Sequence, residues 1–123
     1  MPWEVIAVEE FAAWLLGESD GVQIETAARV AVLAEFGPQL GRPSVETIQG
    51  SAFINLKELR YKVDRRPYRV LFAFDPSRRT VLLLGGDKGK DKRWYLVNVP
   101  IAEDRLREHL ASLEEAAGDG DPV

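Results

Sequence analysis

The pattern of apolar and polar positions changes along the chain, and these changes predict the elements of an α+β domain. Residues 3–8 begin with alternating apolar and acidic positions and continue as a fully apolar run, which is typical of a first strand. Residues 9–16 and 22–36 place apolar groups at helical spacing. Glu9 and Glu10 lie where the dipole of the first helix favours acids, and Gly37-Pro38 ends the second helix. The N-terminal part is therefore expected to be one strand followed by two helices.

The middle of the chain is predicted to form strands. Residues 39–54 are a long connection rich in Gly, Pro and Ser, with an extended segment expected around residues 47–48. Residues 53–63 and 68–75 are expected as strands joined by a turn at 64–67, and residues 80–84 as an almost wholly apolar strand after a second turn. Short turns between consecutive strands indicate an antiparallel meander.

The last third is expected to end in a helix. Residues 94–99 are treated as extended, and Pro100 is expected to open a helix over residues 101–113 with Leu106, Leu110 and Leu113 on one face. Residues 114–123 contain no core-forming pattern and are expected to be a disordered tail. The predicted organisation is one α+β domain over residues 1–113, with two N-terminal helices packed on an antiparallel sheet and a C-terminal helix.

Composition removes several classes of function. The 123 residues fit a single domain and include no cysteine and one histidine, His109. Disulfides and thiolate metal sites are therefore excluded, and a zinc site or a Ser-His-Asp or Cys-His nucleophile would lack partners. The apolar runs are too short to span a bilayer, and the N-terminus lacks the pattern of a signal peptide. We expect a cytoplasmic protein without metal, cofactor or membrane contact.

The charge distribution points to a polyanion as the partner. The chain has 16 Lys and Arg against 20 Asp and Glu, yet 12 of the basic and only 5 of the acidic residues lie between Lys57 and Arg93. Local potential, rather than net charge, decides which anions approach a given face of a protein. This segment is predicted to bind a polyanion, with RNA favoured. The alternative is a solvated sheet face that is basic without a functional reason.

Three charged residues of the predicted strands can meet. Glu58 and Arg60 share one face of their strand, and Arg69 points away from the core in the next strand. In a meander they come together on the sheet face opposite the helices, where a solvated residue tolerates substitution with little loss of stability. Two guanidinium groups can hold a phosphate while the carboxylate accepts a proton from a ribose 2′-hydroxyl. A plain ion-pair ladder is the alternative interpretation.

A second group of cations follows the last predicted strand. Residues 87–95 interleave basic with small or acidic residues and then present two aromatic rings: Lys88, Lys90, Lys92, Arg93, Trp94 and Tyr95. Cations attract phosphates, and an unpaired base stacks on an aromatic ring. This combination favours single-stranded RNA over duplex, whose bases are already stacked. Both rings could instead belong to the core.

Taken in order, several segments resemble the HigB-like, phage Gp49-related branch of the RelE/ParE toxin superfamily: residues 36–43, 56–60 and 68–74, the apolar strand, the lysine-rich run and residues 102–105. The resemblance implies a RelE-like microbial ribonuclease fold and the toxin of a type II toxin-antitoxin system. Such toxins act as mRNA interferases, cleaving messenger RNA in the ribosomal A site by metal-free attack of a 2′-hydroxyl. The resemblance also implies three partners: a helix-turn-helix antitoxin of the HigA type, the ribosome and mRNA.

Carried over by position, the resemblance assigns the grip on the scissile phosphate to Arg60 and Arg69, and a stacking or proton-donating role to Tyr95. The expected catalytic set is Glu58, Arg60, Arg69, Lys90 and Tyr95. The expected RNA-binding set is Lys57, Lys62, Arg65, Arg66, Lys88, Lys92, Arg93 and Trp94. Two alternatives stay open, a ParE-like inhibitor of DNA gyrase and a catalytically inactive relative that acts only by binding a partner.

Overall fold

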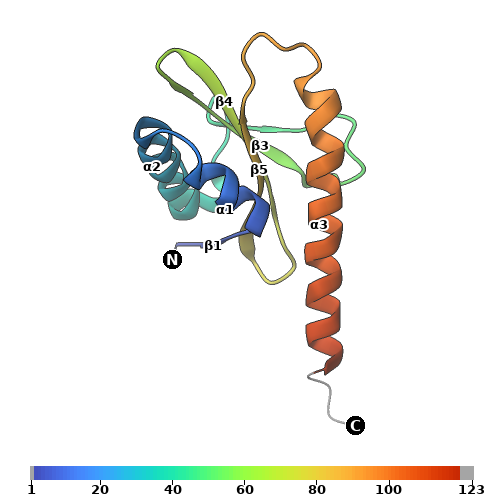
Figure 1. Cartoon of the computed structure of the whole chain (residues 1–123). Coiled ribbons are helices and arrows are strands. Elements are labelled where there is room, and N and C mark those ends of the chain that lie inside the picture. The colour runs from blue at the N-terminus through green and yellow to red at the C-terminus, as the bar shows by residue number, and fades with distance from the viewer. Residues whose placement is uncertain (1, 120–123) are drawn as a thin grey trace.

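A computed structural model describes residues 2–119 and consists of one sheet between two layers of helices (Figure 1). The strands are β1 (Glu4–Ala7), β2 (Val45–Thr47), β3 (Lys57–Val63), β4 (Arg66–Phe74) and β5 (Arg79–Asp87). The helices are α1 (Glu9–Leu16), α2 (Asp20–Phe36) and α3 (Trp94–Asp119), with a short 3-10 turn, η1 (Gly37–Gln39). Helices α1 and α2 cover one face of the sheet and α3 runs along the other.

The sheet order is β1-β5-β4-β3-β2, and every neighbouring pair is antiparallel except β1 and β5, which are parallel. The meander expected from the short turns is the central run β3-β4-β5. The extended segment expected around residues 47–48 is the short edge strand β2. The predicted α+β fold, with two N-terminal helices packed on the sheet and a C-terminal helix, is confirmed.

Two apolar cores lie on the two faces of the sheet. On the side of α1 and α2 the fully buried side chains include Leu33, Val70 and Phe72, and on the side of α3 they include Leu71, Leu83 and Leu106. Strands β4 and β5 are covered on both faces, which is why their sequences are nearly continuous apolar runs.

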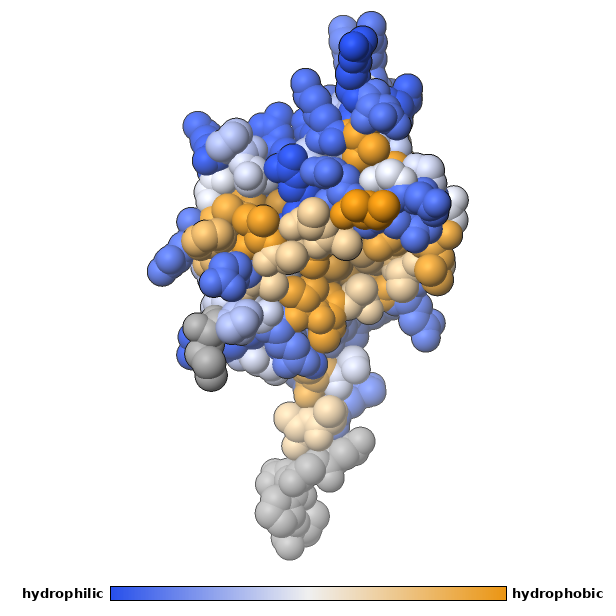
Figure 2. All heavy atoms as spheres, turned by 90° about the vertical axis from the view of Figure 1, so that its left-hand side faces the viewer, coloured by the Kyte–Doolittle hydropathy of each residue, from blue (hydrophilic) through white to orange (hydrophobic). Residues whose placement is uncertain are grey.

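The outer side of α2 is also partly apolar. Figure 2 shows apolar side chains gathered on this face of the molecule. The large apolar side chains exposed on α1 and α2 are Leu16, Ile24, Val32 and Phe36. Helix α2 therefore has apolar groups on its outer side as well as its buried one.

Two adjacent glycines in β5 admit indole rings onto opposite faces of the sheet. A Cβ at Gly85 would overlap the ring of Trp14 from α1, and one at Gly86 would lie 3.3 Å from the ring of Trp94. The strand therefore continues through these glycines to Asp87, three residues beyond the end expected from the sequence. Glycine at both positions lets two large aromatic side chains approach the strand backbone.

The start of α3 differs from the sequence prediction. Residues 94–99, expected to be extended, are helical, and Pro100 lies inside the helix instead of opening it. Trp94, Ala102 and Leu106 recur at multiples of four residues and are buried on one side, so packing against the sheet favours a helix there. Asn98 donates a side-chain hydrogen bond of 2.8 Å to the Trp94 carbonyl, inside the stretch before the proline.

The far part of α3 is tied to the turn between β4 and β5. His109 Nε2 lies 2.8 Å from Asp75 Oδ2, and Arg79 also bonds this carboxylate. Burial alone would raise the pKa of Asp75, but the hydrogen bonds from His109 and Arg79 outweigh it and hold the pKa below its usual value. His109 thus forms a structural contact between α3 and the β4–β5 turn.

Helix α3 ends at Asp119, six residues past the boundary expected from the sequence, and the rest of the predicted tail, residues 120–123, lies outside the described residues. No helix among residues 2–119 is long and apolar enough to cross a membrane.

Candidate active site

Glu58, Arg60 and Arg69 meet on the sheet face that α3 covers. Arg60 and Arg69 are direct partners in the β3–β4 register, and Glu58 lies two positions before Arg60 on the same side of β3. Arg60 Nε is 3.6 Å from Glu58 Oε1, and Arg69 Nε is 3.9 Å from Glu58 Oε2. The strand alternation therefore predicts this meeting correctly.

The surroundings of the three residues differ from the expected solvated sheet face. Glu58 is 6% exposed and Arg69 is 8% exposed, whereas the Arg60 side chain is 40% exposed. Arg69 is held by two hydrogen bonds, from Nη1 to the Tyr68 carbonyl at 2.9 Å and from Nε to the Tyr95 hydroxyl at 3.2 Å. The expectation that Arg69 lies on a solvated sheet face is therefore wrong, because the first turn of α3 covers it.

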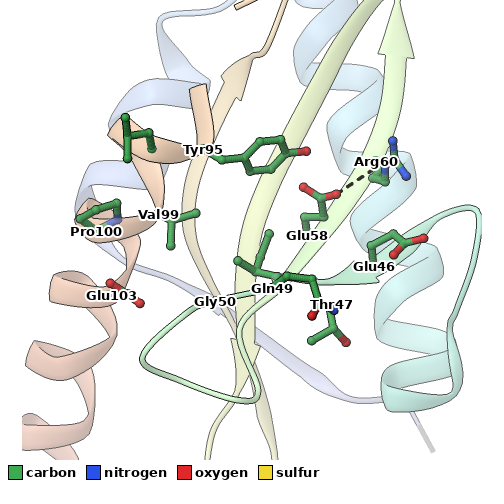
Figure 3. A pocket seen from close by; sticks show the side chains of 12 residues that line it. Glu46, Thr47, Gln49, Gly50, Glu58, Arg60, Tyr95, Val99, Pro100 and Glu103 are labelled. Atoms are coloured by element: carbon green, nitrogen blue, oxygen red, sulfur yellow. Dashed lines mark ion pairs between the residues drawn. The ribbon is translucent and has the colours of Figure 1, made fainter. Parts of the chain in front are cut away.

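Tyr95 brings a hydroxyl group from α3 to this cluster. Figure 3 shows its ring pointing from the helix toward Glu58. Burial raises the pKa of Tyr95, the Glu58 carboxylate raises it further, and Arg69 opposes the rise. The hydroxyl consequently keeps its proton at neutral pH. Lys88 Nζ lies 5.8 Å from the centre of the ring, within the range of a cation–π contact.

One oxygen of Glu58 is buried without a hydrogen-bond donor. This oxygen is Oε2, which lies 3.9 Å from Arg69 Nε, beyond hydrogen-bond distance. Oε2 accepts no hydrogen bond from any residue between 2 and 119. A buried polar atom is normally satisfied, so an exception at a cluster of charged groups calls for an explanation. An oxygen in this state can accept a proton or a hydrogen bond from a ligand.

The cluster lies at the edge of a cleft of about 700 Å³ between α3, β3 and the segment around residue 49 (Figure 3). Glu58, Arg60 and Tyr95 line one part of this cleft, and Leu96 and Glu103 line another. Its volume falls within the usual range for small-molecule sites. Glu58 and Arg60 therefore border a cavity that can hold part of a ligand, and Arg69 lies beside Glu58.

The other predicted cations lie in different places. Lys62 shares the strand face of Glu58 and is exposed, and Arg65 is exposed in the β3–β4 turn with φ of 69°. Arg66 pairs with Asp87 across the sheet. Lys57 points to the opposite face and its ammonium group donates to Thr47 Oγ1 at 3.2 Å. The structure thus separates Lys57 from the charged cluster.

The loop between β5 and α3 carries Lys90, Lys92 and Arg93, all exposed, at the same end of the molecule as the β3–β4 turn (Figure 1). Trp94 is only 6% exposed and packs against the sheet, so its ring is not open to a nucleotide base. Of the two interpretations the sequence allows for Trp94, the structure supports the core position. Lys90, expected among the catalytic residues, is a surface loop residue.

Several residues that line the cleft carry no signal in the sequence. They come from two segments that only the fold brings together, β2 with the loop after it and α3: Glu46, Thr47, Gln49, Leu96, Val99 and Glu103. Glu103 Oε2 accepts hydrogen bonds from Ser51 Oγ at 2.7 Å and from the Ala52 amide at 2.6 Å, which fastens the loop before β3 to α3. An isolated glutamate in a charged helix gives no indication of this role.

Comparisons with known proteins agree with this architecture. The family model for the phage-derived Gp49-like proteins (DUF891) matches residues 13–107. Two proteins of Mycobacterium tuberculosis (strain ATCC 25618 / H37Rv) are similar in sequence. "Putative toxin HigB3" is 42% identical over 109 residues, which are 88% of this chain and 94% of that protein. "Putative toxin HigB2" is 41% identical over 110 residues, 88% of this chain but 55% of its own length.

A solved structure supports the fold independently. A mutant of the E. coli toxin RelE in the free state superposes with a TM-score of 0.55, covering 76% of this chain and 92% of that chain. The sequence identity is 10%, so this likeness concerns the fold alone.

Proposed function

This chain belongs to the phage-derived Gp49-like family and to the HigB-like toxins within it, and from that membership we propose that it is an endoribonuclease of a type II toxin-antitoxin pair. Its substrate is messenger RNA on the ribosome. One observation carries the proposal: Glu58 Oε2 is a buried carboxylate oxygen that accepts no hydrogen bond from residues 2–119, between two guanidinium groups and beside a cleft.

Glu58 is the general base of the proposed step. The 2′-oxygen of a ribose forms a bond to the adjacent phosphorus while its proton passes to Glu58 Oε2. The bond from phosphorus to the 5′-oxygen of the next nucleotide breaks, leaving a 2′,3′-cyclic phosphate and a 5′-hydroxyl end. Arg60 and Arg69 stabilise the additional negative charge that develops on the phosphate.

Tyr95 is the proposed general acid. Its pKa is raised, so the hydroxyl is protonated at neutral pH, and the Arg69 hydrogen bond orients the phenol oxygen. The leaving 5′-oxygen is a far stronger base than a phenolate, so it takes the Tyr95 proton as the bond to phosphorus breaks. Solvent then returns a proton to Tyr95 and removes one from Glu58.

The cations at one end of the molecule are the proposed RNA contacts. Lys62 and Arg65 on the β3–β4 hairpin and Lys90, Lys92 and Arg93 in the next loop are exposed, and the two segments lie at the same end of the molecule (Figure 1). They attract the phosphates on either side of the cleaved one, with an affinity that falls as salt increases. The proposed protein partner is a helix-turn-helix antitoxin of the HigA type.

Induced expression followed by mapping of transcript 5′ ends tests this function. We expect growth arrest with new 5′ ends inside translated reading frames, and both should disappear in Glu58→Gln, which keeps the size of the side chain. Glu108→Gln is the matched control, because Glu108 is exposed on α3 and does not line the cleft.

Other outcomes would contradict the proposal. Intact transcripts with an induced DNA-damage response would indicate a gyrase inhibitor, and no growth defect at all would indicate an inactive relative. Co-expression of a neighbouring helix-turn-helix gene should suppress the arrest, which tests the partner separately from the chemistry.

A further inference from the structure

The cleft reaches Glu58 and Arg60 but stops short of Arg69, which is not among the residues that line it. Arg69 is 8% exposed, and Oε2 of Glu58, the oxygen that the proposed reaction uses, is buried. A phosphate therefore cannot contact Arg69, nor can a ribose hydroxyl contact Oε2, while the chain keeps this conformation. The proposed reaction requires that the element covering these two groups moves away.

The first turn of α3 is this cover. Gly86 is the register partner of Arg69 on β5, and the ring of Trp94 lies 3.3 Å from the position of a Cβ at Gly86. Register partners point to the same face of a sheet, so Trp94 lies beside Arg69. Tyr95 points toward Glu58 from the helix (Figure 3), with its hydroxyl 3.2 Å from Arg69 Nε. Two neighbouring aromatic residues thus enclose Arg69.

The sequence of this turn does not favour a helix. Residues 94–99 end at Pro100, and proline is most favourable as the first residue of a helix. Inside a helix proline has no amide hydrogen to donate, so the Leu96 carbonyl loses its partner four residues ahead. Val99 precedes the proline and is thereby biased toward extended backbone, and Val97 is β-branched. Local preference therefore starts the helix at Pro100.

Tertiary packing adds residues 94–99 to the helix. Trp94 is buried against the sheet, but Leu96 and Val97 are 67% and 52% exposed, so few side chains hold the segment down. Beyond the proline the helix is anchored in the core by Leu106, which is fully buried. Local preference and packing thus oppose each other in this segment, as a two-state element requires.

We propose that residues 94–99 are a lid, which is helical and covers Arg69 and Glu58 in the free chain and unwinds back to Pro100 when a phosphate of the RNA enters. Six residues span roughly 9 Å as a helix and about 20 Å when extended, so unwinding makes room for a phosphate group. Arg69 Nε then donates to the phosphate in place of the phenol, and a hydrogen bond to a charged acceptor is the stronger one. Tyr95 stays on the outer side of the phosphate, as its proposed role as acid requires. The inference rests on the proposed ribonuclease function and adds a control of access to the site.

Two substitutions at one exposed position test the lid without altering the site. Val97 does not line the cleft, and alanine favours a helix more than valine does, whereas glycine favours it less. The ligand binds only the open lid, so its apparent affinity scales with the open fraction of the chain. In an NMR titration, we expect Val97→Gly to bind thymidylyl-thymidine, which lacks a 2′-hydroxyl and cannot react, about fivefold more tightly than Val97→Ala. Ala111→Gly is the matched control, because Ala111 is exposed on α3 beyond Pro100, and it should bind as the wild type does.

Amide hydrogen exchange tests the lid in the free chain, independently of any reaction with RNA. We expect the amides of residues 97–99 to exchange faster than that of Leu106, because the lid opens without unfolding of the core. Exchange at Val99, whose sequence neighbours are unchanged, should be about fivefold faster in Val97→Gly than in Val97→Ala. Ala111→Gly should leave it unchanged. The dinucleotide should speed exchange at Val99, since the phosphate holds the lid open, although a bound ligand ordinarily slows exchange.

The two proposals can fail separately. If residues 97–99 exchange no faster than Leu106, or if the two Val97 variants bind the dinucleotide equally, the lid is overturned. Cleavage by the wild-type chain would then still support the ribonuclease function. If the wild-type chain cleaves no transcript but the Val97 variants differ as expected, the lid stands and the function is wrong. Slower exchange at Val99 with the dinucleotide, or no binding to any variant, would overturn the opening by phosphate.

Discussion

Arg69 Nε donates a hydrogen bond of 3.2 Å to the hydroxyl of Tyr95, joining the middle of the sheet to the first turn of α3 across 26 residues of sequence. The same nitrogen lies 3.9 Å from Glu58 Oε2, too far to donate to it. Because the phenol takes this donor, the carboxylate keeps a buried oxygen without a hydrogen bond. One contact thus orients the proposed acid and leaves the proposed base available.

The two arginines should separate catalysis from stability. Arg60→Ala and Arg69→Ala are each expected to lower cleavage by about 100-fold or more. Arg60→Ala should change the free energy of unfolding by at most about 1 kcal/mol, because its side chain is 40% exposed. Arg69→Ala should lower the free energy of unfolding by about 3–5 kcal/mol, because Glu58 would remain buried without its buried cationic partner. Urea denaturation and cleavage assays measure the two effects.

A double variant is the control for this contrast. Glu58→Gln with Arg69→Met removes both buried charges and should recover much of the stability lost in Arg69→Ala, while activity stays absent. Equal unfolding free energies for Arg60→Ala and Arg69→Ala would show that Arg69 is not held by the contacts described.

Tyr95→Phe should remove the proposed acid while keeping the ring beside Lys88. We expect cleavage to fall by about 100-fold to 10,000-fold, and stability by about 1–3 kcal/mol, because a buried Arg69 donor loses its acceptor. A general acid acts only when it is protonated, so wild-type activity should decline at alkaline pH. Because the pKa of Tyr95 is raised, this decline should begin above the ordinary tyrosine pKa of 10. If the phenylalanine variant keeps the same alkaline decline, Tyr95 is not the acid.

Gly85→Ala tests the packing of Trp14 against β5. The new methyl group would overlap the indole, so the variant should lose about 1–3 kcal/mol of stability. Gly41→Ala is the matched control, because no atom of residues 2–119 lies within 4 Å of a Cβ at that position. Thermal denaturation of both variants checks the difference, and a Gly85→Ala chain as stable as Gly41→Ala would contradict the packing.

Asp75→Asn should weaken the attachment of α3 in a pH-dependent way. The pKa of Asp75 is lower in the folded chain than its ordinary value of 3.8, so the folded state gains stability above that pH and loses it as the pH falls through the lower, folded-state pKa. The stability difference between wild type and variant should therefore be largest near neutral pH and shrink in acid. Asp104→Asn should show no such trend, because Asp104 is exposed and pairs with Arg107 on its own helix.

Much of the fold follows from local patterns. The alternation of Tyr68, Val70 and Phe72 with Arg69 gives the two faces of β4, and the short turn before it sets the pairing with β3. The meeting of Arg60 and Arg69 could therefore be predicted. The start of α3 could not, because Pro100 is a common first residue of a helix and its interior position depends on packing further along the chain.

The sequence by itself determined the strands, their neighbours in the meander and the sheet face on which Glu58, Arg60 and Arg69 meet, because side-chain alternation and short turns are local. Only the tertiary structure decided the burial of Arg69, the contact with Tyr95 and the cleft beside them. These depend on where α3 lies over the sheet, which is set by Trp94 packing on Gly86 and by Leu106 in the core. Such contacts join residues far apart in the chain, and no local period encodes them.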